Sequence, residues 1–181
     1  FESALCGVWS LGCSTNSVLH LTACAHEAGV PLDIDKCDEL GRTAPQICKL
    51  NPASQVFITD LNQVGGIPAV MKELSRKGLI HLDAQTVCGT VRDRVEAAPD
   101  ADGEIIRKIE NPFRPDGGIA VLKGNICPEG AVVKQGAVAP EMMQHVGPAR
   151  CFDCEEDASE AILGGKIKEG DVVVIRYEGP K

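Results

Sequence analysis

The stretch LGCSTNSVLHLTACAHEAGV, residues 11–30, holds the clearest structural signal in the chain. After Gly12 and Cys13 come residue types that commonly cap helices, followed by apolar residues at helical spacing. Gly29 is typical of the position just beyond a helix. The stretch therefore predicts a turn, an N-cap and a helix that stops at Gly29.

The capping residues Ser14, Thr15 and Asn16 are the candidate binding residues of this sequence. A helix N-terminus presents free N–H groups and the positive end of the helix dipole, so it can hold a carboxylate or a phosphate. Ordinary helix capping uses the same residue types and explains them as well on spacing alone. Cys13 precedes this helix end, and the dipole there is expected to lower the pKa of its thiol.

The rest of the first half is predicted to be mostly helical. Caps, glycine stops and apolar stripes indicate helical segments over residues 33–40, 45–50, 59–65, 68–78 and 90–97. His20 and His26 do not share a face of the first helix, which argues against a metal-binding pair. His20 falls within the apolar stripe and is expected to be a core residue.

Composition changes at residues 99–103, PDADG, and the pattern then becomes strand-like. Strands are predicted at residues 119–122, 131–134, 148–152 and 171–176, with a helix over residues 155–163 that stops at a Gly-Gly pair. We therefore expect an α/β protein with a helix-rich first part, a strand-rich second part and a boundary between residues 99 and 117.

Composition excludes several classes of function. The net charge is −8 and aromatic residues make up only 3%, so neither a basic face nor a base-stacking platform for nucleic acid is expected. No apolar run reaches about 18 residues, the length that a membrane-spanning helix requires. Nine cysteines, an odd number, favour a reducing, intracellular setting over a disulfide framework.

Two local motifs have ordinary explanations. Cys151 and Cys154 have CxxC spacing, but a structural zinc site usually needs a second pair, so unrelated thiols are expected. The doublets Gly65-Gly66 and Gly117-Gly118 lack the spacing of a nucleotide-binding loop and are expected to form tight turns. Residue spacing alone therefore predicts an α and β protein with one candidate anion-binding helix end and no defined reaction.

Four long segments, in order, resemble the dihydroxy-acid/6-phosphogluconate dehydratase family. They are LGCSTNSVLHLTACAHEAGV (11–30), FITDLNQVGGIPAVMKELSRKGLIH (57–81), ENPFRPDGGIAVLKGNICPEGAVVK (110–134) and GPARCFDCEEDASEAILGGKIKEGDVVVIRYEGPK (147–181). Together they cover most of the chain. One departure is Cys13, where the family usually has Gly.

The resemblance implies a hydro-lyase that dehydrates a 2,3-dihydroxy carboxylate to a 2-keto acid in branched-chain amino acid biosynthesis. A sugar-acid dehydratase of the same family and a non-catalytic binding module are the alternatives. In this family an iron–sulfur cluster acts as a Lewis acid on the leaving 3-hydroxyl, Mg²⁺ holds the carboxylate side and a serine removes the C2 proton. The resemblance also implies a cytoplasmic homodimer that binds neither nucleic acid nor membrane.

The same resemblance implies which parts of the enzyme this chain contains. Residues 1–105 are expected to be the end of an N-terminal α/β domain, and residues 106–181 the start of a C-terminal, β-barrel-like swivel domain. The cluster and metal ligands and the catalytic serine are expected outside the chain, so none is assigned to its cysteines or to Glu178. What carries over is the turn at Ser14, Thr15 and Asn16, on the substrate side of the cavity.

The two ends of the chain are expected to be internal cuts. Phe1 leads directly into an apolar run, and Lys181 follows what is predicted to be the exit of the last strand. Natural termini are usually polar and loosely held. The chain is therefore expected to be an internal piece of a larger enzyme and inactive alone.

Overall fold

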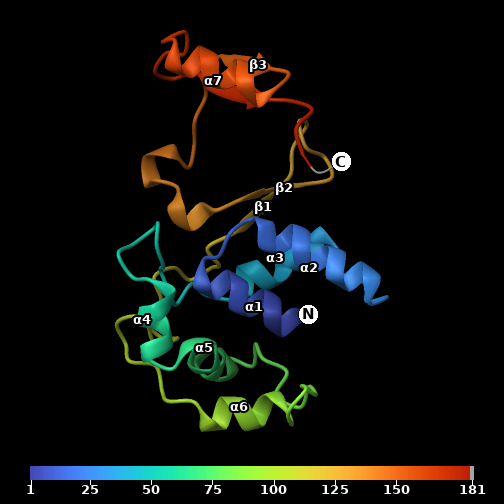
Figure 1. The fold of residues 1–181 in the computed structure, drawn as a ribbon, viewed down its shortest axis with the longest axis vertical. Helices are drawn as coiled ribbons and strands as arrows, with labels where there is room; N and C mark the ends of the chain where they lie inside the picture. Colours follow the sequence, from blue (N-terminus) through green and yellow to red (C-terminus); the bar gives the residue numbers. More distant parts are fainter. Residues whose placement is uncertain (180–181) are drawn as a thin grey trace. The chain divides into compact units, whose positions relative to one another are not determined.

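The structure is a computed structural model that describes residues 1–179. Helices form most of the first half of the chain (Figure 1). They are α1 (Glu2–Leu11), α2 (Asn16–Glu27), α3 (Ile34–Thr43), α4 (Ile58–Gln63), α5 (Gly66–Ser75) and α6 (Val91–Ala97). The described residues divide into two units: unit 1 is Phe1–Val138 and unit 2 begins at Ala139. The predicted boundary near residue 105 is a different division and stays a prediction.

Local capping explains where several helices begin. The carboxylate of Asp33 accepts a hydrogen bond from Lys36 N at 2.7 Å and starts α3. Thr90 and Asp93 bond reciprocally at the start of α6, with Thr90 N donating to Asp93 Oδ2 at 2.7 Å. Such boxes satisfy N–H groups that the helix itself leaves free. The predicted helices at these positions, and the one that ends before Gly29, are confirmed.

The predicted helical turn over residues 45–50 is wrong. Gln46 instead forms an isolated antiparallel bridge with Arg114, and Gln46 O accepts hydrogen bonds from Phe113 N and Arg114 N. Ile47 and Cys48 are both fully buried beside this bridge. A short apolar run does not reveal its backbone state by periodicity, because partners distant in sequence can decide it.

The core of unit 1 forms around α1, which contacts α3 and α5. Leu5 and Trp9 of α1 are completely buried, so the apolar run at the start of the chain supplies one centre of this core. Ile47, Val70 and Leu74 add side chains that are equally buried. Burial of aliphatic and aromatic side chains like these is the main contribution to the stability of a domain of this size.

Two short strands complete unit 1. β1 (Ala120–Leu122) pairs antiparallel with β2 (Ala131–Val133), with Val121 opposite Val132, and β1 also contacts α3. A 3₁₀ turn, η1 (Gln135–Ala137), follows directly. Both strands lie where the sequence predicts them. They bring residues from the second half of the chain against helices of the first.

Unit 2 is a small parallel βαβ unit preceded by the 3₁₀ turn η2 (Pro140–Met142). β3 (Ala149–Phe152) pairs with β4 (Val172–Ile175) in parallel, and α7 (Glu155–Leu163) connects and contacts both strands. A helical crossover is what parallel pairing of adjacent strands requires. Pro180 and Lys181, in the predicted exit of the last strand, lie outside the described residues.

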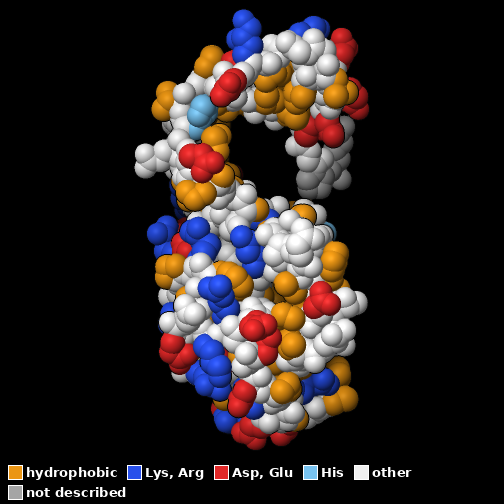
Figure 2. Space-filling model, turned by 90° about the vertical axis from the view of Figure 1, so that its left-hand side faces the viewer, with side chains coloured by type: hydrophobic (Ala, Val, Ile, Leu, Met, Phe, Trp, Pro, Cys, Tyr) orange, Lys and Arg blue, Asp and Glu red, His pale blue; other side chains and the backbone are white. Residues whose placement is uncertain are grey.

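The expected α/β class agrees with this mixture of helices and small sheets. Across residues 1–179 each of the two sheets has two strands, and neither closes into a barrel. None of the helices in this range has the length and apolarity needed to cross a bilayer. On the face drawn in Figure 2, Lys and Arg side chains are interspersed with acidic and apolar ones.

Candidate functional site

The turn at residues 12–16 begins where α1 ends in a Schellman arrangement. Gly12 adopts the left-handed conformation with φ 63° and ψ 47°, its N–H donates to Trp9 O, and Cys13 N donates to Val8 O, both at 3.2 Å. These bonds satisfy carbonyls that the helix would otherwise leave free. The chain direction into the following residues is therefore fixed by α1.

Helix α2 starts directly after this turn, and some polar side chains at its start make no hydrogen bond among the described residues. Ser14 O accepts a hydrogen bond from Ser17 N, and Thr15 O accepts one from Val18 N. Asn16 N donates to Ser14 Oγ at 3.3 Å, whereas the side chain of Thr15, at the N-cap, makes no capping bond within the described chain. The Thr15 hydroxyl and the side-chain amide of Asn16 can thus contact a bound molecule.

Exposure and charge suit the turn to an anion. Ser14 and Asn16 are exposed and Thr15 is half-buried, so all three can be reached from solvent. Lys134, just after β2, lies close enough to Cys13 to stabilise a negative charge there. This cation adds to the positive end of the α2 dipole. The turn therefore combines exposed polar groups with positive charge, which are the features that a site for a carboxylate or phosphate group needs.

The thiol of Cys13 does not behave as the helix-end position alone suggests. Burial raises its pKa, and the opposing influence of Lys134 is the smaller of the two. The expectation of a lowered pKa is wrong, because loss of hydration of the thiolate outweighs the local positive charge. Cys13 is consequently a protonated, half-buried thiol near neutral pH and not an activated nucleophile.

Segments far apart in sequence pack against this turn. Gly118 N donates to Trp9 O at 3.0 Å, and Gly136 N donates to Gly118 O at 2.9 Å. A Cβ atom on Gly118 would lie 2.7 Å from Gly12 Cα, so the backbones touch. Neither Gly117 nor Gly118 has a positive φ. Close packing, and not the expected tight turn, therefore explains the glycines at positions 117 and 118. Gly65 and Gly66, in contrast, do have the positive φ angles that a tight turn requires.

The sequence gives no signal for one residue beneath the turn. Gln46 is only 3% exposed, and its side-chain Nε2 donates to Cys48 O at 3.1 Å. A Cβ atom on Gly12 would approach that Nε2 to 2.5 Å. The local pattern predicts a helical segment over residues 45–50, and only the long-range pairing with Arg114 places Gln46 here.

The remaining candidate motifs do not join this site. His20 is exposed, so the expectation that it is a core residue is wrong; α2 buries only Val18 and Ala25. Cys151 belongs to β3, and Cys154 precedes α7. All nine cysteines are free, and Cys6, Cys37 and Cys48 are buried and pack as small apolar groups.

An apolar hollow of unit 1 lies elsewhere. It has a volume of about 590 Å³ and is lined mainly by α1 and α5, with Val8, Leu11 and Met71 among its walls. None of residues 12–16 lines it. Its only polar lining side chains are those of Ser3 and His81, whereas a site for a small polar acid is expected to bring several polar groups together. The turn therefore remains the better candidate site.

Sequence comparisons match nearly the whole chain to a single protein family. Residues 1–94 match the dihydroxy-acid/6-phosphogluconate dehydratase N-terminal family, and residues 104–181 match the C-terminal family of the same name. A dihydroxy-acid dehydratase of Acetivibrio thermocellus is 59% identical over 100% of this chain and 33% of its own length. One from Lachnoclostridium phytofermentans is 57% identical over the same shares. One from Aquifex aeolicus is 56% identical over 95% of this chain and 31% of its own length.

The chain thus spans about a third of the length of the curated relatives that it matches.

Proposed function

The chain belongs to the dihydroxy-acid/6-phosphogluconate dehydratase family, and we propose that it functions as part of a longer hydro-lyase. The reaction is the conversion of a 2,3-dihydroxy carboxylate to a 2-keto acid in branched-chain amino acid biosynthesis. The observation that carries this proposal is the match of both family regions, in order, over residues 1–94 and 104–181. The relatives named dihydroxy-acid dehydratase favour this substrate class over a sugar acid.

The role proposed for this chain's own site is to hold the carboxylate end of the substrate. Ser14 and Asn16 are exposed at the N-terminus of α2, the Thr15 hydroxyl is not used for capping, and Lys134 adds positive charge nearby. Hydrogen bonds from the Thr15 hydroxyl and the Asn16 side-chain amide to a carboxylate are charge-assisted and therefore among the stronger ones. The turn would fix the orientation of the substrate and leave proton removal to other residues.

The iron–sulfur cluster and Mg²⁺ implied by the family are proposed to bind outside this chain. Within residues 1–179 no group of three or more His, Cys, Asp or Glu side chains converges as a metal site. Burial also raises the pKa of Cys6 to about 11 and of Cys48 to about 12, whereas a thiol must lose its proton to bind a metal. The described residues do not fit either group, and they contribute scaffold and substrate contacts.

The domain and assembly proposals follow from the same family membership. Residues 106–181 are proposed to begin a swivel domain that becomes barrel-like when further strands are added. The open two-stranded sheets are consistent with such an extension, because short isolated strand pairs are rarely stable alone. We also propose a cytoplasmic homodimer, and the nine free thiols fit a reducing compartment.

The test is an assay of the complete gene product, purified without oxygen and supplied with Mg²⁺. Dihydroxyisovalerate should yield its 2-keto acid, while 6-phosphogluconate should be turned over at least about tenfold more slowly, as a difference of one matched contact allows. Residues 1–181 alone serve as the control and should be inactive. Preference for 6-phosphogluconate would replace the proposed substrate with a sugar acid, and no dehydration of either acid would overturn the proposal.

A further inference from the structure

The buried side chain of Gln46 fills a space bounded by three glycines, each from a different backbone segment. A Cβ atom added to Gly12 would lie 2.5 Å from the Nε2 atom of Gln46. A Cβ atom added to Gly136 would lie 2.8 Å from the Oε1 atom of Gln46. At Gly118 the added Cβ would lie 3.2 Å from both the Gln46 Cδ and Oε1 atoms. The glutamine amide therefore touches the end of α1, the segment before β1 and η1 together.

The position of Gln46 is itself fixed by hydrogen bonds from both sides. Its N–H is shared between Arg114 O and Asp116 O, both at 3.1 Å, and its side-chain Nε2 donates to Cys48 O. The next two residues, Ile47 and Cys48, both donate their N–H groups to Ser10 O in the last turn of α1. Gln46 therefore cannot shift without disturbing the end of α1.

We infer that Gln46 is a positioning residue for the proposed substrate site: packed against Gly12, Gly118 and Gly136, it holds the backbone of residues 13–16 so that α2 presents its N-terminus to the substrate. This role rests on the proposed function of the turn. Three glycines cannot fill the volume that a shorter side chain would leave, because they have no side chains to rearrange. Truncation at Gln46 therefore loosens the turn selectively, through a cavity directly beneath it.

Thiol accessibility tests the structural half of this inference without any assay of activity. Cys13 lies in the turn and is half-buried, while Cys6 in the middle of α1 is 1% exposed and becomes accessible only when the helix opens. Alkylation with N-ethylmaleimide, followed by mass spectrometry that resolves the two positions, gives both rates in one sample. The ratio of the Cys13 rate to the Cys6 rate separates local loosening from global unfolding.

We expect Gln46→Ala to raise that ratio by about tenfold and Gln46→Met, which keeps most of the volume, by about threefold. Gln135 offers a matched control, since it is a second buried glutamine whose Nε2 donates to Gly117 O at 2.7 Å. Gln135→Met should leave the ratio within about twofold of the unaltered protein. If Gln46→Ala does not fold, Gln46→Met alone decides the result.

Kinetics of the complete gene product test the functional half. Gln46→Met should raise KM for the dihydroxy acid by about tenfold with kcat within about twofold, because a displaced turn weakens ground-state and transition-state binding equally. Gln135→Met should change neither constant by more than about twofold.

An unchanged Cys13 ratio in the Gln46 variants would overturn the inference, whatever the kinetics. A raised ratio with an unchanged KM would show that the turn is loosened but lies away from substrate, which overturns the role of the turn in the proposed function and with it the positioning role. A fall in kcat alone would also contradict the inference. A raised ratio together with a raised KM supports both.

Discussion

Gly12 is a residue at which both backbone conformation and packing exclude a side chain. Its φ of 63° lies in the left-handed region, and an added Cβ would meet Gln46 Nε2 at 2.5 Å. Gly29, after α2, has nearly the same φ of 66°, but nothing lies within 4 Å of its added Cβ. The two glycines therefore separate conformational strain from steric contact at the ends of consecutive helices.

Gly12→Ala should destabilise unit 1 by about 2–4 kcal/mol, since left-handed strain and overpacking of Gln46 add. Gly29→Ala should cost only about 1–2 kcal/mol, from strain alone. Urea unfolding followed by circular dichroism measures both. Equal losses for the two variants would mean that Gln46 yields to the new methyl group without cost, contrary to the tight packing described above.

Substitution of Asn16 by Asp should raise the stability of the fold and weaken the binding of the substrate. It is the first residue of α2 and is exposed, so Asn16→Asp places a negative charge where the helix dipole favours one, a gain of about 0.5 kcal/mol. The same charge repels a substrate carboxylate, and KM of the complete gene product should rise by about tenfold or more. Thermal unfolding and steady-state kinetics check the two effects.

Asn125→Asp, in the exposed loop between β1 and β2, is the matched control for the added charge and should alter neither property of the enzyme. An Asn16→Asp enzyme with unchanged KM would place the carboxylate of the substrate away from the α2 N-terminus.

At the scale of elements, Glu73 joins α5 to the segment that follows α6. Its carboxylate is 1% exposed, and Oε1 accepts a hydrogen bond from Ile109 N at 2.8 Å. Oε2 accepts no hydrogen bond of good geometry among the described residues, although Arg76 Nε lies 3.3 Å away as an ion-pair partner. We regard the Ile109 bond as the stronger link, because its angle and distance are both favourable.

Glu73→Leu should destabilise the protein by about 3 kcal/mol, because the buried N–H of Ile109 loses its acceptor. Glu73→Gln can keep that acceptor through its amide oxygen and should cost about 1 kcal/mol. Denaturant unfolding of both variants gives the comparison. Equal costs would show that the ion pair with Arg76, and not the bond to Ile109, makes the link.

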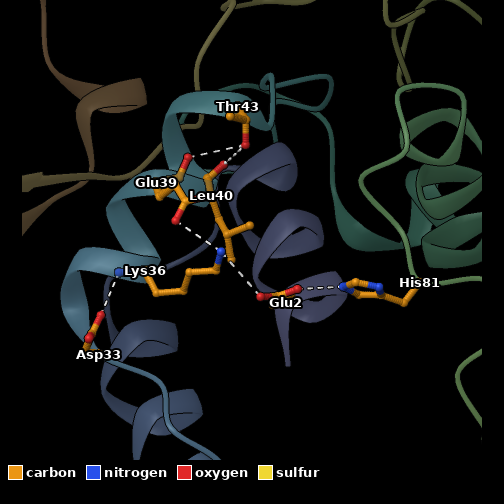
Figure 3. A network of polar contacts seen from close by, with 7 residues as sticks. All are labelled: Glu2, Asp33, Lys36, Glu39, Leu40, Thr43 and His81. Carbon is orange, nitrogen blue, oxygen red and sulfur yellow. Dashed lines mark hydrogen bonds and ion pairs between the residues drawn. The ribbon is translucent and has the colours of Figure 1, made fainter.

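A polar network ties α1 to α3 and to the segment after α5 (Figure 3). Glu2 Oε2 lies 2.7 Å from His81 Nε2, and Glu2 Oε1 lies 3.5 Å from Lys36 Nζ. The hydrogen bond with His81, and secondarily the charge of Lys36, hold the pKa of Glu2 below its ordinary value of 4.5. A carboxyl whose pKa is lowered on folding stabilises the folded state above the ordinary pKa and loses that contribution as the pH falls through the lowered one.

Glu2→Gln should therefore lower stability by a constant amount above pH 4.5, and the difference from the unaltered protein should shrink as the pH falls below that value. The effect should stay under about 1 kcal/mol, because the Glu2 side chain is 42% exposed and solvent screens the pair. Unfolding free energies measured from pH 7 to pH 3 test this. Glu39→Gln, which removes another partner of Lys36 but no contact to His81, is the control. A difference that grows towards low pH would contradict the assignment.

At the scale of the whole chain, local signals predict most elements, and the long-range contacts of Gln46 explain why residues 45–50 are not helical. The N-caps at Asp33 and Thr90 set α3 and α6 through bonds within one helical turn, so sequence alone was sufficient. The bridge of Gln46 with Arg114 joins residues far apart in sequence, and no local pattern encodes it. The turn at residues 13–16 was predicted from its residue types, but the glutamine beneath it was not, because its burial depends on three separate segments.

The two units differ in how much core each one contains. The main hydrophobic cluster lies entirely in unit 1. Among the described residues of unit 2, the buried apolar side chains are those of Ala158 and Ala161 in α7. Both strands of unit 2 are partly exposed. Because local stability follows buried apolar contacts, the two units should open with different free energies.

Hydrogen exchange on residues 1–181 should therefore show amides of β3, β4 and α7 exchanging at least about tenfold faster than those of α1 and α5, the helices centred on Trp9 and Val70. Removal of residues 139–181 should leave the protection of α1 and α5 unchanged within about twofold, since the hydrophobic cluster that contains their buried residues is built from residues before 139. Exchange read by mass spectrometry on both proteins provides the measurement. Loss of protection in α1 after the truncation would show that unit 1 depends on unit 2 for its stability, and equal exchange rates in the intact chain would show that the two units open together.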